Sequence, residues 1–158
     1  MSAVLIVLFA SWLVFRAAGA MGVTALATWR DSARYALAVM FVFTGIAHFN
    51  HLKHELAKMV PRIFPQPLLI IYVTGVLELL GALGLLLPRF RSLAAICLIA
   101  LLIAMFPANM KAASEGMILL GKPATPLWLR LPVQLLFIGL LWWSSVFRGR
   151  RTSEVRAG

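Results

Sequence analysis

The chain has 158 residues, of which 62% are hydrophobic and only 13% are charged, and its mean hydropathy is +0.94. A soluble domain is about 45–50% apolar and about 25% charged, so this composition predicts an integral membrane protein. The net charge of +10 does not predict a partner nucleic acid, because the basic residues are spread through short loops and a C-terminal tail instead of clustering on one helix or face.

Five hydrophobic segments follow one another along the chain, and each predicts a membrane-spanning helix. The first covers residues 3–28. It is predicted to be retained and not cleaved as a signal peptide, because no basic region precedes it and Arg16 interrupts it. The other four cover residues 33–49, 67–87, 92–108 and 127–147. The predicted class is therefore an all-α, polytopic membrane protein folded as one domain over residues 1–158.

The distribution of Lys and Arg predicts the orientation. With the C-terminus inside, the cytoplasmic residues are Arg30, Arg34, Arg89, Arg91, Arg148, Arg150, Arg151 and Arg156. The outer loops then carry only Lys53, Lys58, Arg62, Lys111 and Lys122. This arrangement predicts a multi-pass protein of the cell (inner) membrane with a basic cytoplasmic tail at 148–158. The two longest loops, 50–66 and 109–126, share the outer side, where function is expected to cluster.

A single glutamate, Glu78, lies inside the third segment. An ionisable side chain at that depth costs roughly 2.5–3.5 kcal/mol on insertion scales and is a candidate functional group by default. Residues three and four positions away share its helix face, and they are Thr74, Gly75, Gly81 and Ala82. Small residues mark close helix contacts, so Glu78 is predicted to face the bundle interior. It either holds helices together, or transfers protons or binds the polar head of a ligand.

Glu78 needs a polar partner, and two arginines are candidates. Arg130 enters the fifth segment at its outer end, with Gln134 one turn deeper on the same face, and Arg16 lies in the first segment. The outer ends of the second and fourth segments bring further polar groups to the same half of the membrane. We therefore predict a polar pocket that opens outward and is formed by His48, Glu78, Asn109, Arg130 and Gln134.

The remaining histidines and the single cysteine predict no further site. His48, His51 and His54 are spaced so that two or three could approach one metal ion. Lysines in the same segment favour solvated histidines at the membrane interface, so no metal site is predicted. Cys97 is the only cysteine, which excludes an intrachain disulfide. Its apolar surroundings predict an inert, packed thiol.

Several stretches resemble, in order, the DoxX-like membrane proteins: RYALAVMFVFTGIAHF (34–49), MVP (59–61), YVTGVLELLGALGLLLP (72–88), RSLAAICLIALLIAMFPANM (91–110) and LWLRLPVQLLFIGLLWW (127–143). The resemblance covers about residues 33–145 and implies a DoxX-type four-helix transmembrane bundle. Residues 1–30 would then form an extra N-terminal transmembrane helix, in which Arg16 has no family counterpart. The polar residues of the family pattern fall at the same five positions as the predicted pocket: His48, Glu78, Asn109, Arg130 and Gln134.

The resemblance implies two functions. The first is a subunit of a redox-linked membrane complex that binds a quinone-like or other amphipathic molecule in the polar pocket. The cofactor is unknown, and a quinone is one candidate. The sequence holds no haem, flavin or iron–sulfur motif that could carry electrons, so a docked partner would have to supply them. The alternative is a non-catalytic chaperone or scaffold for assembly of a partner protein. Both imply a partner in the membrane or on its outer side and allow homo-oligomerisation, and because only the first could involve catalysis, enzymatic activity stays open between them.

Overall fold

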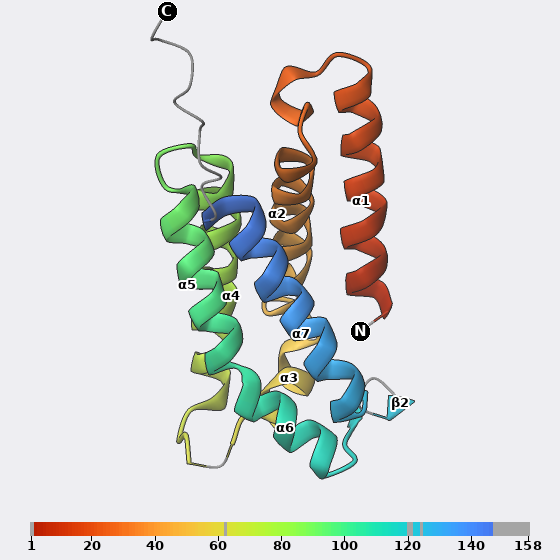
Figure 1. The fold of residues 1–158 in the computed structure, drawn as a ribbon. Coiled ribbons are helices and arrows are strands. Elements are labelled where there is room, and N and C mark those ends of the chain that lie inside the picture. The colour runs from red at the N-terminus through yellow and green to blue at the C-terminus, as the bar shows by residue number, and fades with distance from the viewer. Residues whose placement is uncertain (1, 62, 120–121, 124, 147–158) are drawn as a thin grey trace, which may run out of the picture.

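The computed structural model describes residues 2–61, 63–119, 122–123 and 125–146 (Figure 1). The predicted all-α class is confirmed, with one minimal hairpin as the exception among the described residues. In chain order the elements are α1 (Ser2–Ala20), the 3-10 turn η1 (Thr24–Leu26), α2 (Trp29–Ala47), α3 (Lys53–Met59), α4 (Pro67–Leu86), α5 (Arg91–Ala104), α6 (Phe106–Ser114), β1 (Ile118–Leu119), β2 (Lys122–Pro123), α7 (Leu127–Leu141) and the π-helical turn η2 (Trp142–Val146).

Four helical stretches are long and apolar enough to cross a membrane, and they indicate a membrane protein. They are α1, α4, the continuous stretch Arg91–Ser114 of α5 and α6, and the stretch Leu127–Val146 of α7 and η2. The second predicted segment forms the 19-residue helix α2. Its first two turns carry Arg30, Asp31 and Arg34, which lower its hydropathy. Its crossing of the membrane, and hence the fifth span, stays a prediction.

The fourth predicted segment forms two helices, α5 and α6. α5 ends at Ala104, and α6 begins at Phe106 with Pro107 in its first turn. Proline fits a first helical turn but cannot donate to the preceding one. The chain therefore changes direction at Met105 (Figure 1). The break lies two residues before the proline, and the helix resumes and continues to Ser114.

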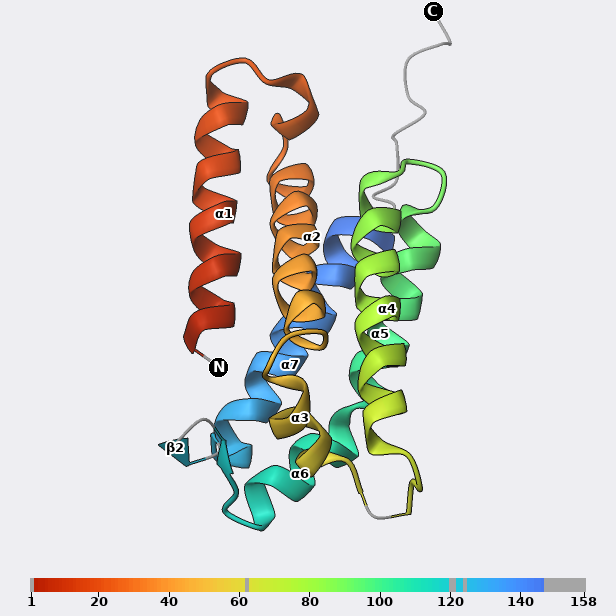
Figure 2. The same cartoon turned by 180° about the vertical axis from the view of Figure 1, so that it is seen from behind.

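Helix α2 occupies the middle of the bundle. It packs against α1 on one side and α4 on the other, while α5 packs against α4, and α7 crosses α2 and α5 (Figures 1 and 2). Figure 2 shows α1 separated from α4 and α5 by α2. The core lies between these helices and is built from Leu8 of α1, Leu37, Met40 and Phe41 of α2, Leu85 of α4, Leu98 of α5, and Phe137 and Leu141 of α7.

The two long loops predicted to share one side lie at the same end of the bundle, where α3 meets α6 (Figure 1). Lys111 joins them, because its Nζ donates to the carbonyl oxygens of Lys58 at 3.0 Å and Val60 at 2.9 Å. The α1–α2 and α4–α5 loops lie at the opposite end. Arg62, the tail from residue 148 and the side chain of Lys122 lie outside the described residues.

Candidate functional site

Glu78 faces the bundle interior, as its small neighbours predict, and is only 4% exposed. Its Oε2 accepts a hydrogen bond from Thr44 Oγ1 of α2 at 2.7 Å. His48, one turn further along α2, places Nδ1 4.0 Å from the same oxygen, and this nitrogen also donates to the Thr44 carbonyl oxygen at 2.9 Å. The buried Glu78 and His48 and the half-buried Thr44 therefore form one group, called here the α2–α4 cluster.

Glycines bring α2 and α4 close enough for these contacts. A Cβ on Gly75 of α4 would lie 2.6 Å from the Cβ of His48. A Cβ on Gly45 of α2 would lie 2.9 Å from the Leu79 side chain. Because the atom met at Gly75 is itself a Cβ, a side chain there would force the helices apart, whereas one at Gly45 would displace the flexible end of the Leu79 side chain. Close approach through small residues is the usual way in which membrane helices pack, and here it places the Thr44 hydroxyl against the carboxyl.

The other three predicted residues form a second group, called here the α5–α7 cluster. Arg130 of α7 is 7% exposed, and its Nη1 donates to Asn109 Oδ1 of α6 at 2.7 Å. Its Nε donates to the Thr125 carbonyl oxygen at 2.7 Å. Gln134, one turn deeper, donates from Nε2 to the Leu102 carbonyl oxygen of α5 at 2.9 Å. Leu102 lies in the last turn of α5, where carbonyl groups lack partners within their own helix.

Neither predicted arginine partner of Glu78 is its partner in the structure. The ion pairs among the described residues join Asp31 with Arg34, Glu55 with Lys58, and Glu78 with His48. Arg130 is held by α6 instead, because α7 packs against α2, α5 and α6, whereas α4 packs against α2, α3 and α5. The five candidates therefore form two clusters on different helix pairs, and the prediction that Arg130 pairs with Glu78 is wrong.

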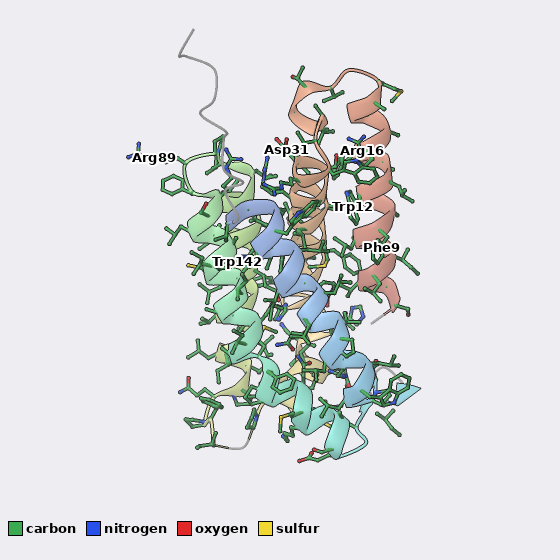
Figure 3. The ribbon with its side chains drawn as sticks, in the orientation of Figure 1. Phe9, Trp12, Arg16, Asp31, Arg89 and Trp142 are labelled. Atoms are coloured by element: carbon green, nitrogen blue, oxygen red, sulfur yellow. The ribbon has the colours of Figure 1, made fainter. Side chains whose placement is uncertain are left out.

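Arg16 is engaged at the interface of α1 with α2. Its guanidinium lies 4.6 Å from the centre of the Trp29 ring, and Nη1 donates to the Ala27 carbonyl oxygen at 3.1 Å. Trp12 packs edge-on against Trp29 with ring centroids 6.1 Å apart. Figure 3 shows Arg16 and Trp12 at successive turns of α1, on the side that meets α2. Arg16 therefore stabilises the entry of the chain into α2 and is not a partner of Glu78.

A groove between α4 and α5 has a different character from the polar pocket that the sequence predicted. Its volume is about 670 Å³, and apolar side chains with glycine and Cys97 line it. None of the five candidate polar residues is among the lining residues. Cys97 is exposed in this groove, so its prediction as a packed thiol is wrong. Small residues one and two turns away, Ala100 and Ala104, line the groove and leave the thiol uncovered.

His51 and His54 are exposed at the α3 end of the bundle, while His48 is 4% exposed. Their side chains therefore point to different surroundings and do not converge. Among the residues that the structure describes, no group of three or more His, Cys, Asp or Glu side chains could hold a metal ion.

Sequence reasoning missed a polar group at the opposite end, where α2 begins. Thr28 is the N-cap of α2: its Oγ1 accepts from the Asp31 backbone N–H at 3.0 Å and donates to Asp31 Oδ2 at 2.6 Å. Arg34 Nη2 lies 2.7 Å from Asp31 Oδ1 and is largely buried. The T-W-R-D spacing is an N-terminal capping signal, and it could have located this group.

The fold and the two clusters define a class: an all-helical membrane bundle whose buried polar side chains bond between helices. Residues 37–146, more than half of the chain, match the family described as a domain of unknown function (DUF8561). The chain belongs to this family. The matched region starts inside α2, ends with η2 and contains both polar clusters, whereas α1 lies outside it. No curated protein and no solved structure gives a significant match.

Proposed function

We propose that the protein is a non-catalytic, DoxX-like membrane scaffold whose helical bundle supports assembly of a partner membrane protein. One observation carries this proposal: each of the five candidate polar side chains already bonds or lies against a protein group in its cluster. Interhelical hydrogen bonds of this kind hold membrane helices in register. Polar groups satisfied in this way are suited to fixing a shape and are poorly placed to receive a ligand.

The proposed arrangement has five spans with the C-terminus in the cytoplasm. α2 would be the fifth span, because its charged start is neutralised in part by the Asp31–Arg34 pair and the Thr28 cap. The α3–α6 end would then face outward. Ile63 and Phe64 are adjacent in the α3–α4 loop, lie outside the candidate spans at this end, and are 83% and 49% exposed. Adjacent exposed apolar side chains are a typical start of a protein contact, so the partner is proposed to dock there.

Two sets of variants test the scaffold proposal in the native membrane. Glu78→Gln and Arg130→Gln should lower the yield of folded protein and the recovery of partner in parallel, with no added ligand. The paired change Ile63→Asp and Phe64→Asp should lower partner recovered per folded chain while the folded yield stays unchanged. Quantitative mass spectrometry after in-cell cross-linking measures both. If the Ile63→Asp and Phe64→Asp double variant recovered as much partner per folded chain as the wild type, the proposed docking site would be wrong.

A redox-linked subunit that binds a quinone-like molecule is a second candidate, supported by the buried Glu78 and His48. Their 4.0 Å separation is too long for a direct hydrogen bond, so a bridging water would have to carry a proton between the carboxyl and the imidazole. Electrons would have to come from a partner protein docked on the outer side. Titration of the purified protein with a short-chain ubiquinone, followed by tryptophan fluorescence, tests this. Saturable binding that Glu78→Gln abolishes without loss of folded yield would favour this candidate over the scaffold.

A further inference from the structure

The groove between α4 and α5 lies on the outer surface of the bundle and follows both helices. From α5 it is lined by Leu93, Cys97, Ala100 and Ala104, which share one helix face. Leucines of α4, 45–58% exposed, form its other wall: Leu77, Leu80 and Leu83. A Cβ on Gly84 would lie 2.7 Å from the Cβ of Ala94, so the two helices touch at the floor. The alanines of α5 and the leucine wall of α4 therefore line an apolar groove that runs along both helices.

The volume of the groove suits a lipid chain better than a protein helix. Its 670 Å³ falls within the range of about 300–1,000 Å³ that is typical of small-molecule sites. A membrane-spanning helix with side chains is about 10 Å across and about 30 Å long, which is several times this volume. A partner helix would lie across the mouth of the groove, whereas an acyl chain would fill it.

A cationic group stands at one end of the groove. The α4–α5 loop contributes Leu87 and Phe90 to the lining, and Arg89 lies between them in the sequence. Arg89 is exposed, and Figure 3 shows it pointing away from the bundle. Within the part of the chain that the structure describes, no hydrogen bond or ion pair holds it. No acidic residue occurs between positions 79 and 114. The N-terminus of α5 begins beside it, and its dipole also favours an anion.

We infer that this groove binds an anionic phospholipid, with one acyl chain between α4 and α5 and the headgroup phosphate at Arg89. Such a molecule needs an apolar surface for its acyl chain and a cation for its phosphate. The groove supplies the first, and Arg89, which no other described residue pairs, supplies the second. The inference goes beyond the proposed function, since the proposed protein partner docks at the opposite, α3–α6 end.

Native mass spectrometry of the full chain tests the inference after purification from vesicles of equal phosphatidylglycerol and phosphatidylcholine. We expect one retained phospholipid per chain, with phosphatidylglycerol preferred. Arg89→Gln should lower that preference about fivefold, the effect of one cation near an anionic surface. Lys58→Gln removes one positive charge at the other end and should leave the preference unchanged.

Filling the groove gives an independent arm of the test. Ala100→Phe and Ala104→Phe should abolish retention of both phospholipids, whereas Ile103→Phe, an exposed position on α5 outside the lining, should not. Circular dichroism checks that each variant remains folded. If Ala100→Phe does not fold, Ala104→Phe alone tests the effect of filling the groove. Cys97, the only thiol, adds a reporter: phosphatidylglycerol should slow its alkylation by a maleimide.

Three results would overturn the inference. One is equal retention of both phospholipids by the wild type and by Arg89→Gln. Another is unchanged retention in both filling variants. The third is a membrane protein, cross-linked through Cys97, that occupies the groove in place of lipid. None of these results depends on partner recovery at the α3–α6 end, so the scaffold proposal and the lipid site can fail separately.

Discussion

Thr44 holds the Glu78 carboxyl inside the bundle, because its hydroxyl donates the 2.7 Å hydrogen bond across the α2–α4 contact. A buried carboxyl whose donor is removed keeps its desolvation cost and loses the compensation. The hydrogen-bond donor to the Glu78 carboxyl is therefore a threonine, whereas the negative charge of a carboxylate predicts an arginine. The same principle applies to Arg130, whose shortest side-chain partner is the amide oxygen of Asn109.

Replacing Thr44 with Val should lower the free energy of unfolding by about 1–3 kcal/mol, whereas Thr44→Ser should retain most of it. Unfolding in detergent micelles, followed by circular dichroism, measures this. The matched control is Thr74→Val, because the Thr74 hydroxyl donates to the Ile70 carbonyl of its own helix at 2.9 Å; its effect should stay within about 0.5 kcal/mol. Equal losses at the two threonines would contradict the role given to Thr44.

At the scale of elements, glycines set the spacing of the central helices. Gly75→Ala places a Cβ 2.6 Å from His48 Cβ, so the helices must separate, and the loss in unfolding free energy should be about 1–3 kcal/mol. Gly139→Ala is the control, because a Cβ there meets no atom within 4 Å. It should be neutral or stabilise α7 by up to about 1 kcal/mol. The same micelle unfolding assay checks both, and a neutral Gly75→Ala would refute close packing.

The contact of α3 with α6 depends on Lys111, whose ammonium group bonds two carbonyl oxygens at the end of α3. Lys111→Met keeps the aliphatic stem and removes both hydrogen bonds. We expect faster amide hydrogen exchange in residues 53–60, with exchange in α2 unchanged, as local opening would produce. Lys58→Gln, which removes only an exposed pair with Glu55, should have little effect. Exchange that rises equally throughout the bundle would show that Lys111 supports the whole fold.

For the whole molecule, the membrane crossing of α2 decides between four and five spans. Single cysteines in a Cys97→Ser background test it: His51→Cys at the α3 end, and Met21→Cys and Arg89→Cys at the other. In intact cells an impermeant maleimide should label only His51→Cys, and the other two should react only after permeabilisation. If Met21→Cys and His51→Cys react alike, α2 does not cross, and the five-span arrangement fails.

The sequence predicts which segments are helical better than it predicts how they meet. Apolar runs predict the helices, and small neighbours predict that Glu78 faces inward, because both signals depend on residues close together in the sequence. The pairing of Arg130 with Asn109 is not local, since it depends on α7 packing against α6 and not against α4. Cys97 shows the same limit: its apolar surroundings predict a packed thiol, and in the structure it is exposed in an open groove.

Energetic coupling between pairs of polar residues measures the organisation of the buried groups most directly. Double-mutant cycles with Glu78→Gln compare Thr44→Val with Arg130→Gln, using unfolding free energies in micelles. Two separate clusters predict a coupling of about 0.5–3 kcal/mol between Glu78 and Thr44, and additivity within about 0.5 kcal/mol between Glu78 and Arg130. Strong coupling of Glu78 to Arg130, with none to Thr44, would instead establish one shared polar site and contradict the structural role given to both clusters.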